Sequence, residues 1–210
     1  MIFIFELLFL ALFVTTLVAL VSVLIMVIRG SRRSAMRLLR VGGPVWVGYL
    51  LIVVAVSATT TQRIIPMGQD LCFDEMCFAV IRAQPVSQLR SGDGAVRANG
   101  QFYVITVRVS SRSRGRAQSE GGLRALLWDS EKYYGVSPQG ERAWEADNGE
   151  TARLTARLQP GDSVLSVQVF DVPKEISAPG LVLSHGFTPG YFVIGECPLF
   201  HKPTIVRINP

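Results

Sequence analysis

Histidine is scarce in this chain of 210 residues, which contains only His185 and His201. A hydrolytic triad needs a histidine within reach of a nucleophile and of an orienting acid. Ser184 and His185 are neighbours on a predicted strand, so their side chains should point to opposite faces. The sequence also lacks the glycine-rich loops that bind phosphates or dinucleotides. We therefore expect no enzymatic activity and no cofactor bound through a recognisable motif.

Cysteine is scarce too, and its odd count of three leaves the disulfide pairing open. Cys72 and Cys77 flank a four-residue segment, and a bridge between them is the pairing that we expect in an oxidising compartment. Cys197 is then left over, or it replaces one of the other two. The alternative is a metal centre of Cys197, His201 and His185, similar to the copper sites of some β-sandwiches. No methionine follows His201 at a short spacing, so we expect structural roles and no bound metal.

Charge is missing from two long stretches near the N-terminus. Residues 1–28 contain Glu6 as their only ionisable side chain, and residues 41–58 contain no charged side chain. As helices they would reach about 42 and about 27 Å, against a hydrocarbon core of about 30 Å. The basic segment that opens a cleavable secretory signal is also missing. We therefore predict transmembrane helices at 1–28 and 41–60, followed by an extracytoplasmic domain at 61–210.

The segment between the two apolar stretches, residues 29–40, is rich in arginine and has no acidic residue. Its arginines are Arg29, Arg32, Arg33, Arg37 and Arg40. Short loops rich in Lys and Arg stay in the cytoplasm. We therefore predict a cytoplasmic loop at 29–40 and a multi-pass protein of the bacterial inner membrane with both termini on the periplasmic side. Glu6 should then reach the outer interface or contact a helix of another subunit.

The arginine segment accounts for most of the formal net charge of +5. From Gln62 onward the chain has 16 of the 21 basic residues and 15 of the 16 acidic ones, a net of +1. A nucleic-acid-binding domain would concentrate positive charge, so we expect no nucleic acid partner. One basic patch is expected at a solvated hairpin tip, with an anionic partner or lipid headgroup as the alternative. It consists of Arg108, Arg112, Arg114 and Arg116.

Beyond residue 61 the apolar residues come in short runs separated by Gly, Pro, Asp, Asn and Ser, which predicts an all-β domain. Two runs alternate with a period of two, which places one face of each strand on a core. They are Tyr103, Ile105, Val107 and Val109, and Leu165, Val167 and Val169. Asn99-Gly100 is expected at a turn. The predicted strands are 76–83, 101–110, 123–129, 151–158, 163–171, 181–184, 191–194 and 204–208, enough for a two-sheet sandwich.

Four segments of the predicted sandwich follow one another in a characteristic order. They are Gly100-Gln-Phe-Tyr-Val-Ile-Thr-Val-Arg-Val-Ser110, Leu126-Leu-Trp-Asp129, Leu158-Gln-Pro-Gly-Asp162 and Val167-Gln-Val-Phe-Asp-Val-Pro173. From Gly100 to His185 this order resembles the immunoglobulin-like domains of uncharacterised bacterial exported or membrane-anchored proteins. The resemblance implies an immunoglobulin-like β-sandwich and a binding or accessory role without a catalytic site.

Taken together, these features predict a non-catalytic accessory or structural subunit of a larger bacterial inner-membrane complex, such as a photosynthetic or respiratory assembly. The expected partners are other integral membrane subunits and the lipid bilayer. A free-standing, membrane-anchored periplasmic binding module is the second interpretation, and a periplasmic copper protein is the third. A pigment or lipid held between the helices through apolar side chains would leave no motif, so the sequence does not decide whether one is bound.

Overall fold

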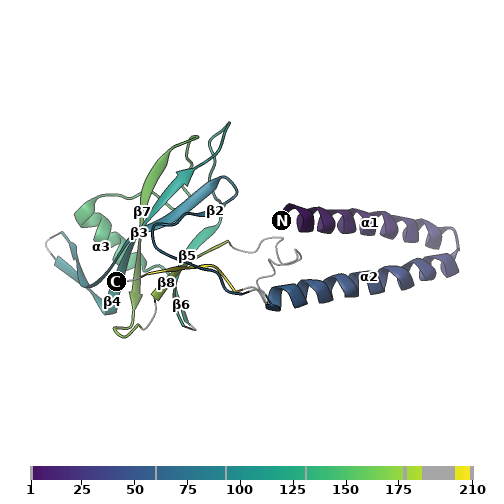
Figure 1. The fold of residues 1–210 in the computed structure, drawn as a ribbon, viewed down its shortest axis with the longest axis horizontal. Coiled ribbons are helices and arrows are strands. Elements are labelled where there is room, and N and C mark those ends of the chain that lie inside the picture. Colours follow the sequence, from purple (N-terminus) through teal and green to yellow (C-terminus); the bar gives the residue numbers. More distant parts are fainter. Residues whose placement is uncertain are drawn as a thin grey trace. The chain divides into compact units, whose positions relative to one another are not determined.

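The computed structural model describes residues 2–59, 61–92, 94–130, 132–176, 179–185 and 202–208, without the side chains of residues 2–6, Ser57 and His185. The described residues form two compact units, one of the residues up to Gln62 together with Lys202 and the other of residues 63–185 and 203–208 (Figure 1). Among the described residues, the first unit contains two long helices, and the second contains nine strands and a short helix.

The helical unit is a hairpin of two antiparallel helices, α1 (Ile2–Ile28) and α2 (Arg32–Thr59). Gly30 ends α1 with a φ of 76°, a conformation that glycine adopts without steric penalty. The N–H of Ser31 donates to the carbonyl of Met26 at 2.8 Å, which completes a Schellman cap. Because this cap turns the chain within three residues, α2 begins immediately after it.

α2 begins nine residues before the predicted start at residue 41. Residues 32–40 are mainly Arg, Leu, Met and Ala, which are strong helix formers. The segment expected to be a loop at 29–40 is therefore largely helical, and residues 29–31 alone connect the helices. By length and composition, α1 and α2 are each able to cross a membrane.

The β unit consists of two packed sheets. One sheet has the order β1 (Ile64–Ile65), β9 (Ile205–Arg207), β8 (Pro179–His185), β5 (Leu123–Asp129) and β6 (Lys132–Tyr134). The other has the order β2 (Leu71–Phe73), β3 (Met76–Ser91), β4 (Gly94–Ser111) and β7 (Ser163–Val172). All neighbouring strands are antiparallel except β1 and β9, which are parallel. The prediction of a β-sandwich is confirmed.

The main core lies between the two sheets. Its fully buried side chains include Phe78 and Ile105 from one sheet and Leu127 and Leu181 from the other. Phe170 of β7 is also buried there without any exposure. Each such side chain contributes about 1.5–3 kcal/mol by leaving water, so this layer is the main source of the domain's stability.

The predicted strands at 123–129, 163–171, 181–184 and 204–208 correspond to β5, β7, β8 and β9. β3 and β4 extend well beyond the predicted 76–83 and 101–110, because they form a long hairpin whose turn follows Ser91. The predicted strand at 151–158 is wrong, since this segment turns at residues 154–155 and only Leu158 pairs, as a single bridge with Gln118. The predicted strand at 191–194 lies outside the described residues.

The domain is not all-β, because helix α3 (Pro138–Asn148) follows β6. The hydroxyl of Ser137 accepts from the N–H of Gly140 at 3.2 Å, and Pro138 occupies the first turn, which together start the helix. Trp144 packs beside Phe102 on the outer face of the β3–β4–β7 sheet. The sequence did not predict this helix, because it is short and mostly polar and has too few apolar residues to reveal a helical period.

Candidate functional site

The two helices of the hairpin meet through aromatic side chains. Tyr49 and Val53 of α2 are buried against Phe9 and Leu12 of α1. The ring of Trp46 meets that of Tyr49 edge to face, with centroids 5.8 Å apart. This cluster joins the helices at the end of the hairpin away from the turn, since it involves early residues of α1 and late residues of α2.

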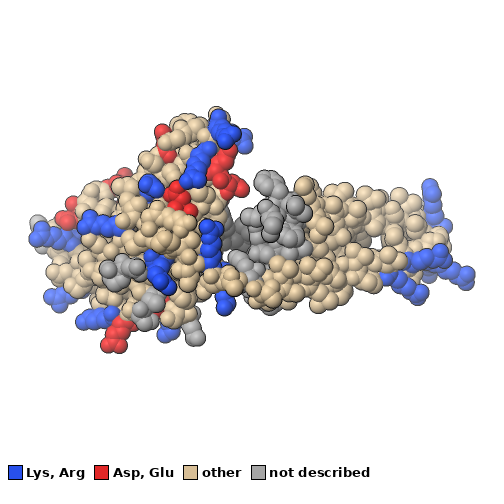
Figure 2. Space-filling view, viewed as in Figure 1, with Lys and Arg blue, Asp and Glu red and all other residues tan. Residues whose placement is uncertain are grey.

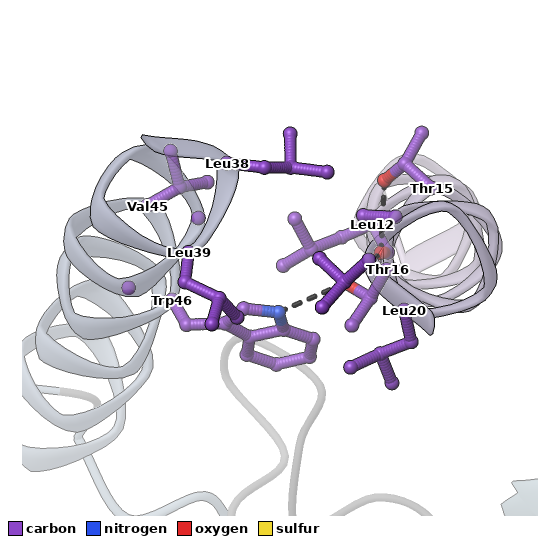
Figure 3. A pocket seen from close by; sticks show the side chains of 12 residues that line it. Leu12, Thr15, Thr16, Leu20, Leu38, Leu39, Val45 and Trp46 are labelled. Atoms are coloured by element: carbon purple, nitrogen blue, oxygen red, sulfur yellow. Dashed lines mark hydrogen bonds between the residues drawn. The ribbon is translucent and has the colours of Figure 1, made fainter. Parts of the chain in front are cut away.

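A cleft opens between this cluster and the turn. Here α2 carries Gly42 and Gly43, and a methyl group added at either glycine would touch no neighbouring atom. Ala19 of α1 is also small. Because these three residues have little or no side chain, a cavity of about 380 Å³ remains between the helices. Figure 3 shows larger side chains around it, namely Leu12, Thr16 and Leu20 from α1 and Leu38, Leu39 and Trp46 from α2.

The polar atoms that line this cleft are bonded within the hairpin. The indole N–H of Trp46 donates to the hydroxyl of Thr16 at 2.9 Å, and that hydroxyl donates to the carbonyl of Leu12 at 2.7 Å (Figure 3). The hydroxyl of Thr15 donates to the carbonyl of Ala11 at 2.9 Å. Because these groups already have partners, the cleft presents hydrocarbon to an occupant. It suits an apolar chain and offers no group for catalysis.

The five arginines predicted as a topology signal lie at the turn of the hairpin. Arg29, Arg32, Arg33, Arg37 and Arg40 are all exposed. Figure 2 shows basic side chains gathered at this end of the hairpin, and the sequence has no acidic residue between Glu6 and Asp70. Arg37 and Arg40 flank Leu38 and Leu39, which line the cleft. A strongly positive surface therefore borders one end of an apolar cavity.

The predicted disulfide between Cys72 and Cys77 is present in the β unit. The two residues face each other directly across β2 and β3, with their Cα atoms 4.0 Å apart. Cys77 is completely buried, so the bridge ties the short strand β2 to the sandwich. For so small a ring the expected stabilisation is about 2 kcal/mol.

The predicted basic patch is not at a hairpin tip. Arg108 lies within β4, and the other three arginines follow in the connection to β5. The carboxylate of Asp70 pairs with Arg108 at 3.1 Å and with Arg112 at 2.6 Å. Arg114 and Arg116 are exposed. Because one acid serves two arginines, the patch keeps less positive charge than its sequence suggests, and such surface pairs contribute about 0–1 kcal/mol each.

A second cleft, of about 560 Å³, lies in the β unit and is lined by residues of β5, β7 and α3. Its polar side chains are Arg124, Glu141, Arg153, Thr155 and Gln168. Burial raises the pKa of the Glu141 carboxyl above its ordinary value of 4.5, and the negative charge of Glu145 raises it further. This cleft therefore combines two guanidinium groups with a carboxyl group that is harder to ionise than usual.

Replacing Glu141 with glutamine should change how stability depends on pH. The pKa of Glu141 is higher in the folded chain than in the unfolded chain, so this carboxyl loses its proton at a lower pH when the chain is unfolded. The free energy of unfolding therefore falls as the pH rises between these two pKa values. Glu141→Gln should therefore be more stable than the parent chain at neutral pH, with the gain absent well below pH 4.5. Thermal unfolding at several pH values measures this. Glu150→Gln, at an exposed position, is the control, and an equal gain at acid and neutral pH would contradict the prediction.

Several predicted site residues cannot be placed. Cys197 and His201 lie outside the described residues, as do the side chains of Glu6 and His185. The metal centre considered for Cys197, His201 and His185 is therefore not tested. Within the described part of the chain, no group of three or more His, Cys, Asp or Glu side chains is placed to hold a metal ion. The interhelical cleft was not predicted, although Gly42 and Gly43 mark it in the sequence.

No protein family model matches the sequence, and no curated protein matches it. Among solved structures, a conserved hypothetical protein from Bacillus anthracis is 16% identical over 57% of this chain and 89% of its own, with a TM-score of 0.48. A secreted protein from Mycobacterium tuberculosis is 12% identical over 71% of this chain and 100% of its own, with a TM-score of 0.47. An uncharacterised β-sandwich protein from Clostridium difficile 630 is 12% identical over 71% and 96%, with a TM-score of 0.42.

Proposed function

We propose that this chain is an anchored protein of the bacterial inner membrane, with α1 and α2 crossing the bilayer and the β-sandwich on the periplasmic side. The observation that carries the proposal is the exposure of apolar side chains along both helices, such as Leu17, Leu24 and Leu51. A soluble protein rarely leaves so large an apolar surface in water. In a bilayer the same surface contacts lipid, and the backbone hydrogen bonds are satisfied within each helix.

Two independent features support this orientation. The exposed arginines at the turn match the positive charge of cytoplasmic loops. The disulfide between Cys72 and Cys77 matches a domain that folds in an oxidising compartment. With the turn in the cytoplasm, the ends of both helices away from the turn are periplasmic, and so is the β unit that follows α2.

Within this setting we propose a non-catalytic accessory role in a larger membrane complex. The helices leave most of their apolar surface, including two clefts between them, uncovered by each other, and this is the surface that partner helices or lipids would cover. The sequence of the β unit has none of the glycine-rich motifs that bind phosphates or dinucleotides. Its contribution would then be to bind or cover a partner on the periplasmic side.

We also propose that the sandwich is immunoglobulin-like. Counted from β3, the strands of one sheet have the order first, second, fifth, and those of the other have the order seventh, sixth, third, fourth. In an immunoglobulin-like domain the corresponding orders are A-B-E and G-F-C-C′. The segment at 151–158, predicted as a strand, occupies the position of strand D in this scheme and is irregular.

The state of the disulfide tests the location of the β unit. In a Cys197→Ser background, intact cells are quenched with acid and the denatured protein is treated with a large maleimide that shifts its mass on a gel. A periplasmic domain should show no shift unless a reductant is added first, because Cys72 and Cys77 are bonded to each other. Two modified thiols before reduction would place the domain in the cytoplasm and end the proposal.

Extraction in a mild detergent tests the accessory role. The full chain, captured through a C-terminal tag, should bring other membrane proteins with it in a fixed ratio. Recovery of the chain as a lone species of 23.0 kDa would contradict membership in a complex. It would favour the second candidate, a free-standing binding module, for which the polar cleft beside Glu141 is the supporting observation.

A further inference from the structure

The dimensions of the interhelical cleft limit what can occupy it. The cleft runs along α1 from Leu12 to Val23, which is about 16 Å of helix. A helix about 10 Å in diameter would fill about 1,300 Å³ over that length, well above the cavity volume of about 380 Å³. The cleft is therefore too small to enclose a third helix, and its size suits a single hydrocarbon chain.

The lining of the cleft selects the same kind of occupant. Leu20, Leu39 and Val23 contribute hydrocarbon, and the polar atoms of Trp46 and Thr16 are bonded to partners within the hairpin. A polar ligand would lose its bonds to water here and gain none from these groups, at a cost of about 1–3 kcal/mol for each buried polar group. An acyl chain makes no hydrogen bonds to water, so it loses none when it enters the cleft.

The positive charge near the cleft indicates which kind of headgroup a bound lipid would have. On α2 the lining of the cleft begins at Leu38 and continues away from the turn of the hairpin. Arg40 does not line it but lies three residues before Gly43, on the neighbouring part of the helix surface, with Arg37 one turn further back. If the turn lies at the cytoplasmic surface, the cleft runs in the direction of an acyl chain whose headgroup is at that surface. Guanidinium groups bind phosphate through paired hydrogen bonds. A zwitterionic headgroup would gain less from five arginines with no acid among them, because its own cation would be repelled.

We propose that the cleft between α1 and α2 binds one anionic phospholipid, with an acyl chain against Gly42 and Gly43 and the phosphate at Arg37 and Arg40. This inference rests on the proposed membrane anchoring, and it adds a specific ligand site to it. The lipid would fill the space left by the two glycines. Its anionic headgroup would also bind the protein to the cytoplasmic leaflet.

Native mass spectrometry of the full-length protein in a mild detergent tests the proposal. The probes are phosphatidylglycerol and phosphatidylcholine with identical acyl chains. The parent chain should retain one phosphatidylglycerol, with a preference over phosphatidylcholine of about tenfold, since each nearby arginine favours an anionic lipid. Equal retention of the two lipids, or retention of neither, would overturn the assignment.

Two variants of the same helix locate the site. Gly42→Leu fills the cleft and should lose most of the bound phosphatidylglycerol. Gly48→Leu is the matched control, because Gly48 is also open to a side chain but lines a separate cleft between the helices, beside Tyr49 and Ile52. Circular dichroism and gel filtration verify that both variants fold. If both variants lose the lipid, or if both keep it, the lipid does not lie against Gly42 and the proposal fails.

A third variant tests the headgroup contact. Arg37→Gln combined with Arg40→Gln leaves Arg29, Arg32 and Arg33 at the turn end of the hairpin to maintain orientation. It should bring the preference for phosphatidylglycerol close to one while still binding lipid. An unchanged preference would overturn the phosphate assignment, and a bound protein in place of lipid would overturn the choice of occupant. Either result leaves the membrane anchoring intact, because that is tested separately by the state of the disulfide.

Discussion

Replacing Gly100 with alanine should lower the free energy of unfolding of the β-sandwich by about 3 kcal/mol or more. Gly100 lies within β4, where a Cβ atom would collide with the carbonyl oxygen of Val172 and lie 2.8 Å from the Cα of Pro173. Both obstacles are backbone atoms, which cannot rotate away as a side chain can. The two strands would have to separate where Gln101 pairs with Val172.

The local hydrogen bonds make this separation more costly. The carboxylate of Asp171 accepts from the backbone N–H of Asn99 at 3.1 Å and from its side-chain amide at 2.8 Å. These bonds hold β4 against β7 beside Gly100, so a shift there would break them. Denaturant unfolding of the full chain in detergent, followed by near-ultraviolet circular dichroism, measures the loss.

Gly115→Ala is the matched control for this prediction. A Cβ atom at Gly115 would meet no atom within 4 Å, so alanine there should change the free energy of unfolding by no more than about 0.5 kcal/mol. Equal stability of Gly100→Ala and Gly115→Ala would show that β4 and the end of β7 do not lie as close together as described.

Replacing Phe170 with alanine should cost about 3–5 kcal/mol, the usual range for removing a fully buried phenylalanine. Phe170 has no exposed surface, and it lies in the core between the two sheets. It is paired with Tyr103 of β4 on one side and forms a bridge with Val136 on the other. The cavity left by the ring could not be filled without moving both neighbours.

Leu165→Ala in the same strand separates this effect from a general weakening of β7. Leu165 is 52% exposed, so most of its side chain already contacts solvent. Its removal should cost no more than about 1 kcal/mol in the same denaturation experiment. Similar losses for the two variants would mean that β7 does not bury Phe170 between the sheets as described.

The alternating residues of β7 show why a period of two does not identify which core a strand faces. Val167 and Val169 were predicted to face a core, and both are buried, but they pack beneath α3 on the outer face of the sheet. Phe170 and Val172 face the core between the sheets. Alternation reveals that a face is covered, whereas what covers it depends on where a distant helix lies.

The roles of particular glycines also depend on distant parts of the chain. Asn99-Gly100 has the composition of a turn, yet it lies inside β4, and Gly100 is needed there because the backbone after β7 passes close to it. Gly42 and Gly43 lie within α2, where they open the cleft. In both places the neighbour that gives the glycine its role is 19 or more residues away in the sequence.

The sequence by itself determined the features that depend on near neighbours. These are the two apolar helices, the short strands such as β5, and the pairing of Cys72 with Cys77, which their spacing in one hairpin allows. Only the tertiary structure decided the cleft beside Trp46, the pairing of Asp70 with two arginines and the placement of α3. These arise from contacts between segments far apart in the chain, and a local pattern of polarity carries no information about which distant segment will supply them.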